Sequence, residues 1–295
     1  MGLYRIRHST VYEYEKPVVL GHSMACVLPR DLRAQKLVNG SVLVEPKGGF
    51  TSQHVDYFGN RVVYVSVSNP HRRFALTADS TIDVTTTTPY KDSPAWETAR
   101  DVFDVNSTDT TEKQGALHGV SEYRLPSPMV PLLDGPAEYA RPSFTPERPA
   151  LEALSDFMAR IHTDFKYDSK ATDVGTPISK VMALRSGVCQ DFAHLFISGA
   201  RSLGLATRYV SGYLETKPPP RRPKLRGADA SHAWVGVWIP DLGWCDFDPT
   251  NNRIPDEQYV TLAWGRDFSD VSPLKGVIFG GGGHTVKVSV DVERL

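Results

Sequence analysis

Residues 187–194 read Gly-Val-Cys-Gln-Asp-Phe-Ala-His, and they open an amphipathic stretch that runs to Leu203. Apolar residues recur there at helical spacing, and Gly204 is a typical residue just beyond a helix C-terminus. The pattern predicts a helix from about Cys189 to Leu203. A helix N-terminus carries free N–H groups and partial positive charge, so a thiol placed there is favoured as its reactive thiolate.

Further helices are expected before this one, and strands after it. A helix opens at Thr145-Pro146 or Pro149, and a shorter one opens at Thr176-Pro177 and ends at Gly187. The predicted strands are 207–214, 233–239, 244–247 and, after the glycines 280–283, about 285–292. Helices followed by antiparallel strands are an α+β pattern, because a parallel sheet would alternate strand and helix.

The first ninety residues alternate in short β-rich runs separated by turn residues, which favours a sandwich or an open barrel. Residues 91–145 are polar and rich in proline, with one short helix expected near 95–100. We therefore expect a β-sandwich-like domain at 1–90, a connector at 91–145 and a catalytic domain at 146–295.

Composition excludes several classes of protein. The 295 residues are 40% hydrophobic and 23% charged with a net charge of −1, so bulk charge favours neither nucleic acid nor an anionic membrane. Three widely spaced cysteines without a Cys-x-x-Cys pair argue against a disulfide framework and a structural zinc site. No apolar run suits a signal peptide or a membrane span. We expect a cytoplasmic protein without cofactor or metal; its oligomeric state stays open.

His232 and Asp248 supply the partners that a nucleophilic Cys189 needs. His232 lies at the start of one predicted strand and Asp248 at the end of the next, with the turn Pro240–Gly243 between the strands. The hairpin folds Asp248 back toward His232, where a carboxylate would orient the imidazole and stabilise its cation. These residues offer a nucleophile, a base and an orienting group.

The register of this hairpin is not fixed by the sequence. If Ile239 pairs with Trp244, Asp248 falls opposite Val235 and on the other face of the sheet from His232. A bulge or a longer loop would bring the carboxylate back.

Each of the three residues also has a plain structural interpretation. Alone, Cys189 would be a buried cysteine, His232 a strand-end histidine and Asp248 a turn residue. Their joint placement at the ends of regular elements is what favours catalysis. Cys26 and Cys245 are expected in the core.

Several neighbouring residues are given lesser roles by the sequence. Gln190 and Asp191 follow Cys189 in the first turn, where Asp191 either complements the helix dipole or has a direct role; His194 is structural. His284 reads as a loop residue, and a metal site combining it with His232 lacks ligand spacing. The basic, proline-rich segment 217–226 is either a solvated loop or a flap that selects acidic or extended substrates.

Four blocks of sequence in this order resemble the bacterial transglutaminase-like cysteine-peptidase superfamily, over roughly residues 150 to 265. The blocks are 187–194, 206–214, 231–235 and 243–251, and residues 4–10 and 56–61 resemble the β-rich N-terminal region that accompanies this core. The resemblance implies a papain-like α+β core, with helices packed on an antiparallel sheet, behind a β-rich N-terminal domain. It also implies a triad of Cys189, His232 and Asp248.

The expected function is attack of Cys189 on an amide of a peptide or protein substrate, with a thioester intermediate and hydrolysis by water. Acyl transfer to an amine, as in a protein-glutamine transglutaminase, is the alternative within the same chemistry. Two others remain: a non-catalytic binding module on this fold, and a metal-dependent hydrolase.

Overall fold

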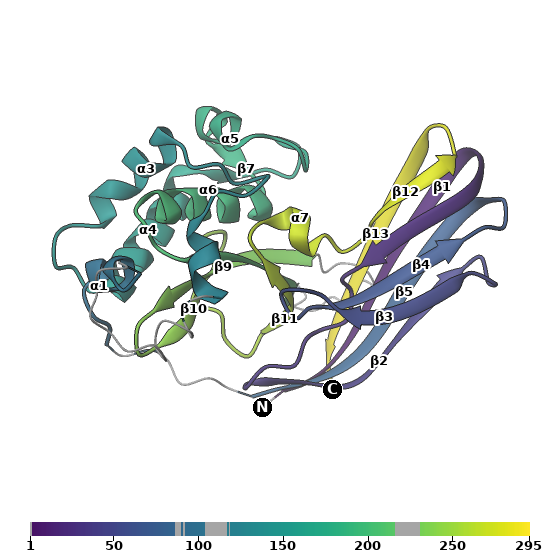
Figure 1. Ribbon diagram of the computed structural model, residues 1–295, viewed down its shortest axis with the longest axis horizontal. Helices are drawn as coiled ribbons and strands as arrows, with labels where there is room; N and C mark the ends of the chain where they lie inside the picture. The colour runs from purple at the N-terminus through teal and green to yellow at the C-terminus, as the bar shows by residue number, and fades with distance from the viewer. Residues whose placement is uncertain (1, 86–89, 91, 104–116, 118, 216–230) are drawn as a thin grey trace, which may run out of the picture.

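The computed structural model describes residues 2–85, 90, 92–103, 117, 119–215 and 231–295. Helices pack on a small antiparallel sheet in one unit, and a larger sheet of long strands lies beside it (Figure 1). This arrangement confirms the expected α+β class with a β-rich N-terminal region. None of the helices in these ranges is long and apolar enough to cross a membrane.

The larger sheet is built on the long strand β1. Its seven strands are β1 (Gly2–Ala25), β2 (Gln35–Glu45), β3 (Phe50–Val55), β4 (Arg61–Val67), β5 (His71–Val84), β12 (Lys275–Gly280) and β13 (His284–Arg294). Strands β5 and β4 pair with one edge of β1, and β13 and β12 pair with the other, all antiparallel. Strand β2 then pairs with β5, and β3 with β4.

Two expectations about domains are corrected by this sheet. The sequence places residues 275–294 in the expected catalytic domain at 146–295, but they pair with β1 of the N-terminal sheet. Period-two alternation predicts that a segment is a strand and which side chains share a face, but it does not identify the partner strand. The described N-terminal strands also form one sheet, not the two facing sheets of a sandwich.

The second unit is a four-stranded antiparallel sheet covered by helices. Its strands, in spatial order, are β10 (Gly243–Phe247), β9 (Ser231–Ile239), β8 (Thr207–Leu214) and β11 (Tyr259–Gly265). The helices are α1 (Trp96–Asp101), α3 (Asp134–Ala140), α4 (Ala150–Asp164), α5 (Ile178–Leu184), α6 (Cys189–Ser202) and α7 (Phe268–Val271), with 3-10 turns η1 (Glu122–Arg124) and η2 (Arg141–Ser143) and the short parallel pair β6 (Lys166–Tyr167) and β7 (Ser186–Gly187).

Helix α6 is the centre of this unit. Every residue from Asp191 to Arg201 is buried, because the helix packs against β8 and β9 on one side and against α3, α4 and α5 on the other. A helix buried all round is fixed by its neighbours along its whole length. The residue that begins it, Cys189, is therefore held by the core of the protein.

Parts of the expected connector and of the helix preceding Cys189 differ from the prediction. The Ser198 hydroxyl donates to the Pro131 carbonyl at 2.8 Å, and the Arg201 guanidinium donates to the Leu125 carbonyl at 3.0 Å, so this part of 91–145 belongs to the core. Helix α5 ends at Leu184, where Arg185 takes a left-handed conformation with φ 49°. The sequence predicted that this helix would continue to Gly187, and that prediction is wrong.

The two units meet at strand β11, the last strand of the smaller sheet among the described residues. The Gln35 side chain donates to the Thr261 carbonyl and accepts from the Thr261 N–H, both at 2.8 Å. Asn60 does the same with Trp264, at 2.8 and 2.9 Å. These side-chain amides satisfy backbone groups that a neighbouring strand would otherwise bind. The outer edge of β11 is therefore held by the N-terminal unit.

Candidate active site

Cys189 is the first residue of α6, as the sequence predicts. The carboxylate of Asp191 turns back and accepts the Val188 N–H at 2.8 Å and the Thr172 hydroxyl at 2.6 Å. Burial raises the pKa of Asp191, against the opposing effect of these two hydrogen bonds. Asp191 therefore stabilises the start of the helix, which fixes the backbone on which the thiol stands.

Gly187 makes room for this cap. A Cβ at Gly187 would lie 2.6 Å from Oδ2 of Asp191 and 2.9 Å from its Cβ, closer than any side chain tolerates. Gly187 also pairs with Tyr167 in the short β6–β7 ladder. The glycine is needed for close approach, a role different from the helix end that the sequence suggested.

His232 and Asp248 form a buried hydrogen-bonded pair. Nε2 of His232 donates to Oδ2 of Asp248 at 2.7 Å, and the two side chains are 11% and 0% exposed. The same carboxylate accepts the Tyr259 hydroxyl at 2.8 Å, the Asn251 side-chain amide at 2.7 Å and the Thr250 N–H at 2.9 Å. Because Nε2 is engaged by the carboxylate, Nδ1 is the ring nitrogen left for other partners.

The hairpin register explains how this pair forms. Gly243, not Trp244, pairs with Ile239, and Phe247 pairs with Val235. Continuing this register by one residue places Asp248 opposite Trp234, which shares a face of the sheet with His232. A shift of one residue therefore moves the carboxylate onto the imidazole's side, without the bulge that the other register would require.

The charged forms of the pair support one another. Burial opposes a charge on His232, yet the hydrogen bond to Asp248, followed by the interactions with Cys189, raises the pKa of His232 to about 10. Burial likewise opposes a charge on Asp248, but the hydrogen bonds from His232, Asn251 and Tyr259 lower its pKa. The site thus favours an imidazolium held by a carboxylate at neutral pH.

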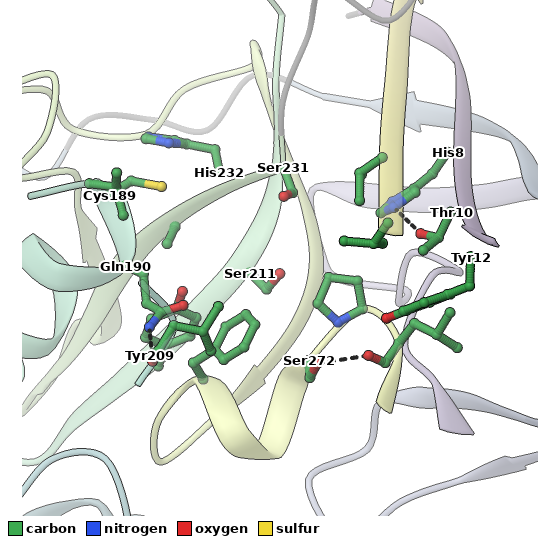
Figure 2. A pocket seen from close by; sticks show the side chains of 18 residues that line it. His8, Thr10, Tyr12, Cys189, Gln190, Tyr209, Ser211, Ser231, His232 and Ser272 are labelled. Atoms are coloured by element: carbon green, nitrogen blue, oxygen red, sulfur yellow. Dashed lines mark hydrogen bonds between the residues drawn. The ribbon is translucent and has the colours of Figure 1, made fainter. Parts of the chain in front are cut away.

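Cys189 and His232 line one cleft of about 460 Å³. Figure 2 shows the sulfur of Cys189 beside the His232 ring, with the β1 side chains of His8, Thr10 and Tyr12 across the cleft. Ser211 and Ser231 lie between the two sides. The structure therefore brings all three predicted residues together, with Asp248 behind the histidine and both units contributing to the cleft.

The remaining cysteines and histidines lie elsewhere. Cys26 and Cys245 are 5% and 0% exposed, and burial raises the pKa of the first thiol to about 11 and of the second to about 12. His194 is buried and accepts the Phe268 N–H at 3.2 Å, and burial lowers its pKa to about 4. The ring of His284 lies against the Tyr12 and Tyr14 rings, outside the lining of the cleft.

Sequence reasoning missed three residues that complete this site. Asn251 belongs to the block 243–251 but has no predicted role of its own, and Tyr259 carries no local signal because it reaches Asp248 from β11, across the sheet. Tyr167 precedes the cysteine by more than twenty residues; burial and then the nearby Cys189 raise its pKa. Tyr259 and Tyr167 depend on contacts between separate segments, which spacing along the chain does not reveal, whereas Asn251 lies only three residues from Asp248.

The basic segment 217–226 lies outside the described residues, so its interpretation as a loop or a flap remains a prediction. Among the residues that the structure describes, no three His, Cys, Asp or Glu side chains are grouped as a metal site would need.

Comparison with other proteins places the chain in a family. Residues 4–83 match the bacterial transglutaminase-like N-terminal region, and residues 137–249 match the transglutaminase-like superfamily. The crystal structure of a candidate cysteine protease from Cytophaga hutchinsonii shares the fold, with a TM-score of 0.77 and 21% identity over 100% of this chain and 91% of that one.

Proteins related in sequence were also found. An uncharacterised protein of Mycobacterium tuberculosis is 39% identical over 98% of this chain and 92% of its own length. The protein-glutamine gamma-glutamyltransferase of Pseudomonas aeruginosa is 33% identical, but over only 32% of this chain and 15% of that protein. The chain therefore belongs to the transglutaminase-like superfamily and carries the bacterial transglutaminase-like N-terminal region.

Proposed function

We propose that the protein is a cysteine-dependent amide-bond enzyme that hydrolyses peptide or isopeptide bonds in a peptide or protein substrate. Cys189 is the nucleophile, His232 the general acid and base, and Asp248 the residue that orients the imidazole. One observation carries the proposal: a thiol at the start of α6 shares a cleft with a histidine that is hydrogen-bonded to a fully buried carboxylate.

The chemistry follows from these positions. The sulfur of Cys189 forms a bond to the substrate carbonyl carbon, and the carbonyl electron pair moves to oxygen. The N–H groups that begin α6 have no partner within the helix and are available to that oxyanion. As the tetrahedral intermediate collapses, the C–N bond breaks and His232 gives its proton to the leaving nitrogen. A thioester and a free amine result.

Water completes the cycle. His232, now neutral, accepts a proton from a water molecule as it attacks the thioester, and the C–S bond breaks to release the acid and Cys189. An amine in place of water would give transglutamination, and the name of the Pseudomonas relative keeps this second candidate in view. Water needs no binding site of its own, which favours hydrolysis.

We retain the reducing cytoplasm as the proposed compartment, since all three cysteines are unpaired and the mechanism requires Cys189 reduced.

The first test measures activation of the thiol. Iodoacetamide at neutral pH should alkylate Cys189 much faster than Cys26 and Cys245, as read by mass spectrometry of peptides. Cys26 and Cys245 are buried, so they would react slowly even if Cys189 were not activated. The informative comparison is therefore between the wild type and His232→Ala. The variant should slow alkylation of Cys189 by about tenfold or more, since the imidazolium that pairs with the thiolate is gone. Equal rates in the two proteins would refute an activated thiol.

The second test identifies the reaction. A peptide library is incubated with the protein, with and without a primary-amine donor, and with Cys189→Ala as control. New peptide termini or deamidated side chains that require Cys189 indicate hydrolysis, whereas incorporation of the donor indicates acyl transfer. Binding of library peptides by both proteins without any product would favour the binding module.

A further inference from the structure

The wall of the cleft that faces Cys189 comes from the N-terminal sheet. Thr10 and Tyr12 of β1 and Val286 and Val288 of β13 all line the cleft. Thr10 pairs with Val288, and Tyr12 pairs with Val286. Paired residues of an antiparallel ladder share a face, so these four side chains form one surface, here called the sheet wall. Figure 2 shows Thr10 and Tyr12 on the side of the cleft away from Cys189.

The two valines are the exposed part of the sheet wall, whereas Thr10 beside them is 3% exposed. Farther along β13, on the same face, Val290 and Val292 are 1% and 2% exposed and pack with Tyr213 of the smaller sheet. Val286 and Val288, by contrast, are 51% and 56% exposed. The two units therefore meet at one end of this face and separate toward the other. The open end of the wedge is the cleft.

The closed end of the wedge is fixed by a buried hydrogen bond. Nδ1 of His8 and the Tyr213 hydroxyl are 2.8 Å apart, and Thr10 approaches the other ring nitrogen of His8 at 3.3 Å. Burial lowers the pKa of His8 to about 4, so the ring is neutral at physiological pH. The sheet wall is thus held at a fixed position relative to the smaller sheet, and His8, where the two units meet, carries no charge.

Apart from the His232 ring, which is hydrogen-bonded to Asp248, the described lining of the cleft contains no charged side chain. Phe268 of α7, which packs with the core of the smaller unit, lines one side of the cleft, and the two valines of the sheet wall line the other. An apolar group entering between them loses contact with water, which is favourable. A charged group at the sheet wall would lose hydration without gaining a partner there, because the charge of His232, on the other side of the cleft, is already paired with Asp248. A cleft of about 460 Å³ is of a size that holds such a group beside the reacting amide.

We propose that the sheet wall is a specificity subsite that binds an uncharged, apolar side chain of the substrate, next to the amide that Cys189 attacks. The inference deepens the proposed function and rests on it. It gives the N-terminal unit a direct part in choosing substrates, and it excludes substrates with a charged residue at that position.

The test uses reagents that require a thiol but no turnover. Rates of alkylation of Cys189 are measured with three reagents: iodoacetamide, an iodoacetamide carrying an isobutyl group on nitrogen, and one carrying a carboxymethyl group. For each protein the two substituted reagents are compared with the unsubstituted one, which is too small to need the sheet wall. The wild type should react with the isobutyl reagent about tenfold faster than with the carboxymethyl reagent, after correction by the rates of a small free thiol.

Val286→Lys should abolish or reverse this preference, because an ammonium group then stands where the apolar group binds. Val277→Lys is the matched control: Val277 is 63% exposed on β12, outside the cleft, and the substitution should leave the preference unchanged. The rate with unsubstituted iodoacetamide should be the same in all three proteins, which shows that the thiol itself is intact.

Two failures can be told apart. Slow labelling by iodoacetamide in the wild type speaks against the proposed function, whatever the preference. Normal labelling without a preference for the isobutyl reagent, or with a preference that survives Val286→Lys, overturns the subsite. Concentration-dependent association of the wild type that Val286→Lys abolishes would assign the sheet wall to contact between two copies of the chain, and would also overturn it.

Discussion

The side-chain amide of Asn60 pairs with the backbone N–H and carbonyl of Trp264, at 2.9 and 2.8 Å. Asn60 itself is fully buried, and it also accepts from the Arg30 guanidinium. A single residue of the N-terminal unit thus takes the place of a neighbouring strand at the edge of the smaller sheet. The attachment of the two units, and with it the cleft, depends on such contacts.

Asn60→Ala should lower the free energy of unfolding by about 2–4 kcal/mol, since it leaves two backbone groups of Trp264 without their partner and removes one of the acceptors of the Arg30 guanidinium. Urea unfolding followed by circular dichroism measures the change. Asn69→Ala is the control, because Asn69 is exposed and its loss should cost little. Equal stabilities of the two variants would contradict the role given to Asn60.

Asp248→Asn should reduce turnover more at pH 8.5 than at pH 6. The aspartate holds the pKa of His232 near 10, and without its charge that pKa should fall toward the ordinary value of 6.5. At pH 8.5 the variant would lack the proton that the leaving nitrogen needs, and kcat/KM should fall by roughly tenfold or more. Asp241→Asn, an exposed substitution in the same hairpin, should show no such change. A loss of the same size at both pH values would count against the assignment.

The same pair predicts how stability depends on pH. Because folding raises the pKa of His232, its contribution to stability is complete below about pH 6.5 and is lost as pH rises from there to about 10. Urea unfolding of the wild type at pH 6.5, 8.0 and 9.5 should show this decline, and Asp248→Asn should show a shallower one. Parallel curves for the two proteins would mean that the pair does not stabilise the charged imidazole.

Gly187→Ala should lower both stability and the reactivity of Cys189. The added methyl group would lie 2.6 Å from the Asp191 carboxylate, which must then release the Val188 N–H at the start of α6. We expect a loss of about 1–3 kcal/mol and slower alkylation by iodoacetamide. Gly119→Ala is the control and should leave stability and labelling nearly unchanged, since a Cβ there meets nothing within 4 Å. Unchanged labelling of Cys189 would show that the cap does not position the thiol.

Much of the unit that carries the candidate active site was predictable, because the sequence patterns that indicate its helices and strands are local. The start of α6 at Cys189, the left-handed Gly204 after it and strand 207–214 each depend on residues close in sequence. The order of cysteine, histidine and aspartate was equally visible.

What could not be predicted depends on contacts across space. The hairpin register turns on the left-handed conformations of Asp241 and Gly243, with φ of 67° and 77°, and a change of one residue reverses the face of Asp248. Similarly, alternation showed that 285–292 is a strand but not that its partner is β1. The sequence therefore predicted the strand that contains Val286 and Val288, but not that this strand forms a wall of the cleft.

That wall has a consequence for synthesis of the protein. Strand β13 is made long after the segment that carries Cys189, His232 and Asp248, yet it supplies one side of the cleft that Cys189 and His232 line. A nascent chain that has emerged from the ribosome only as far as Trp264 would hold the thiol and its histidine in a cleft that lacks the wall supplied by β13. The subsite that we propose is complete only when residues 284–294 have been translated and have paired with β1.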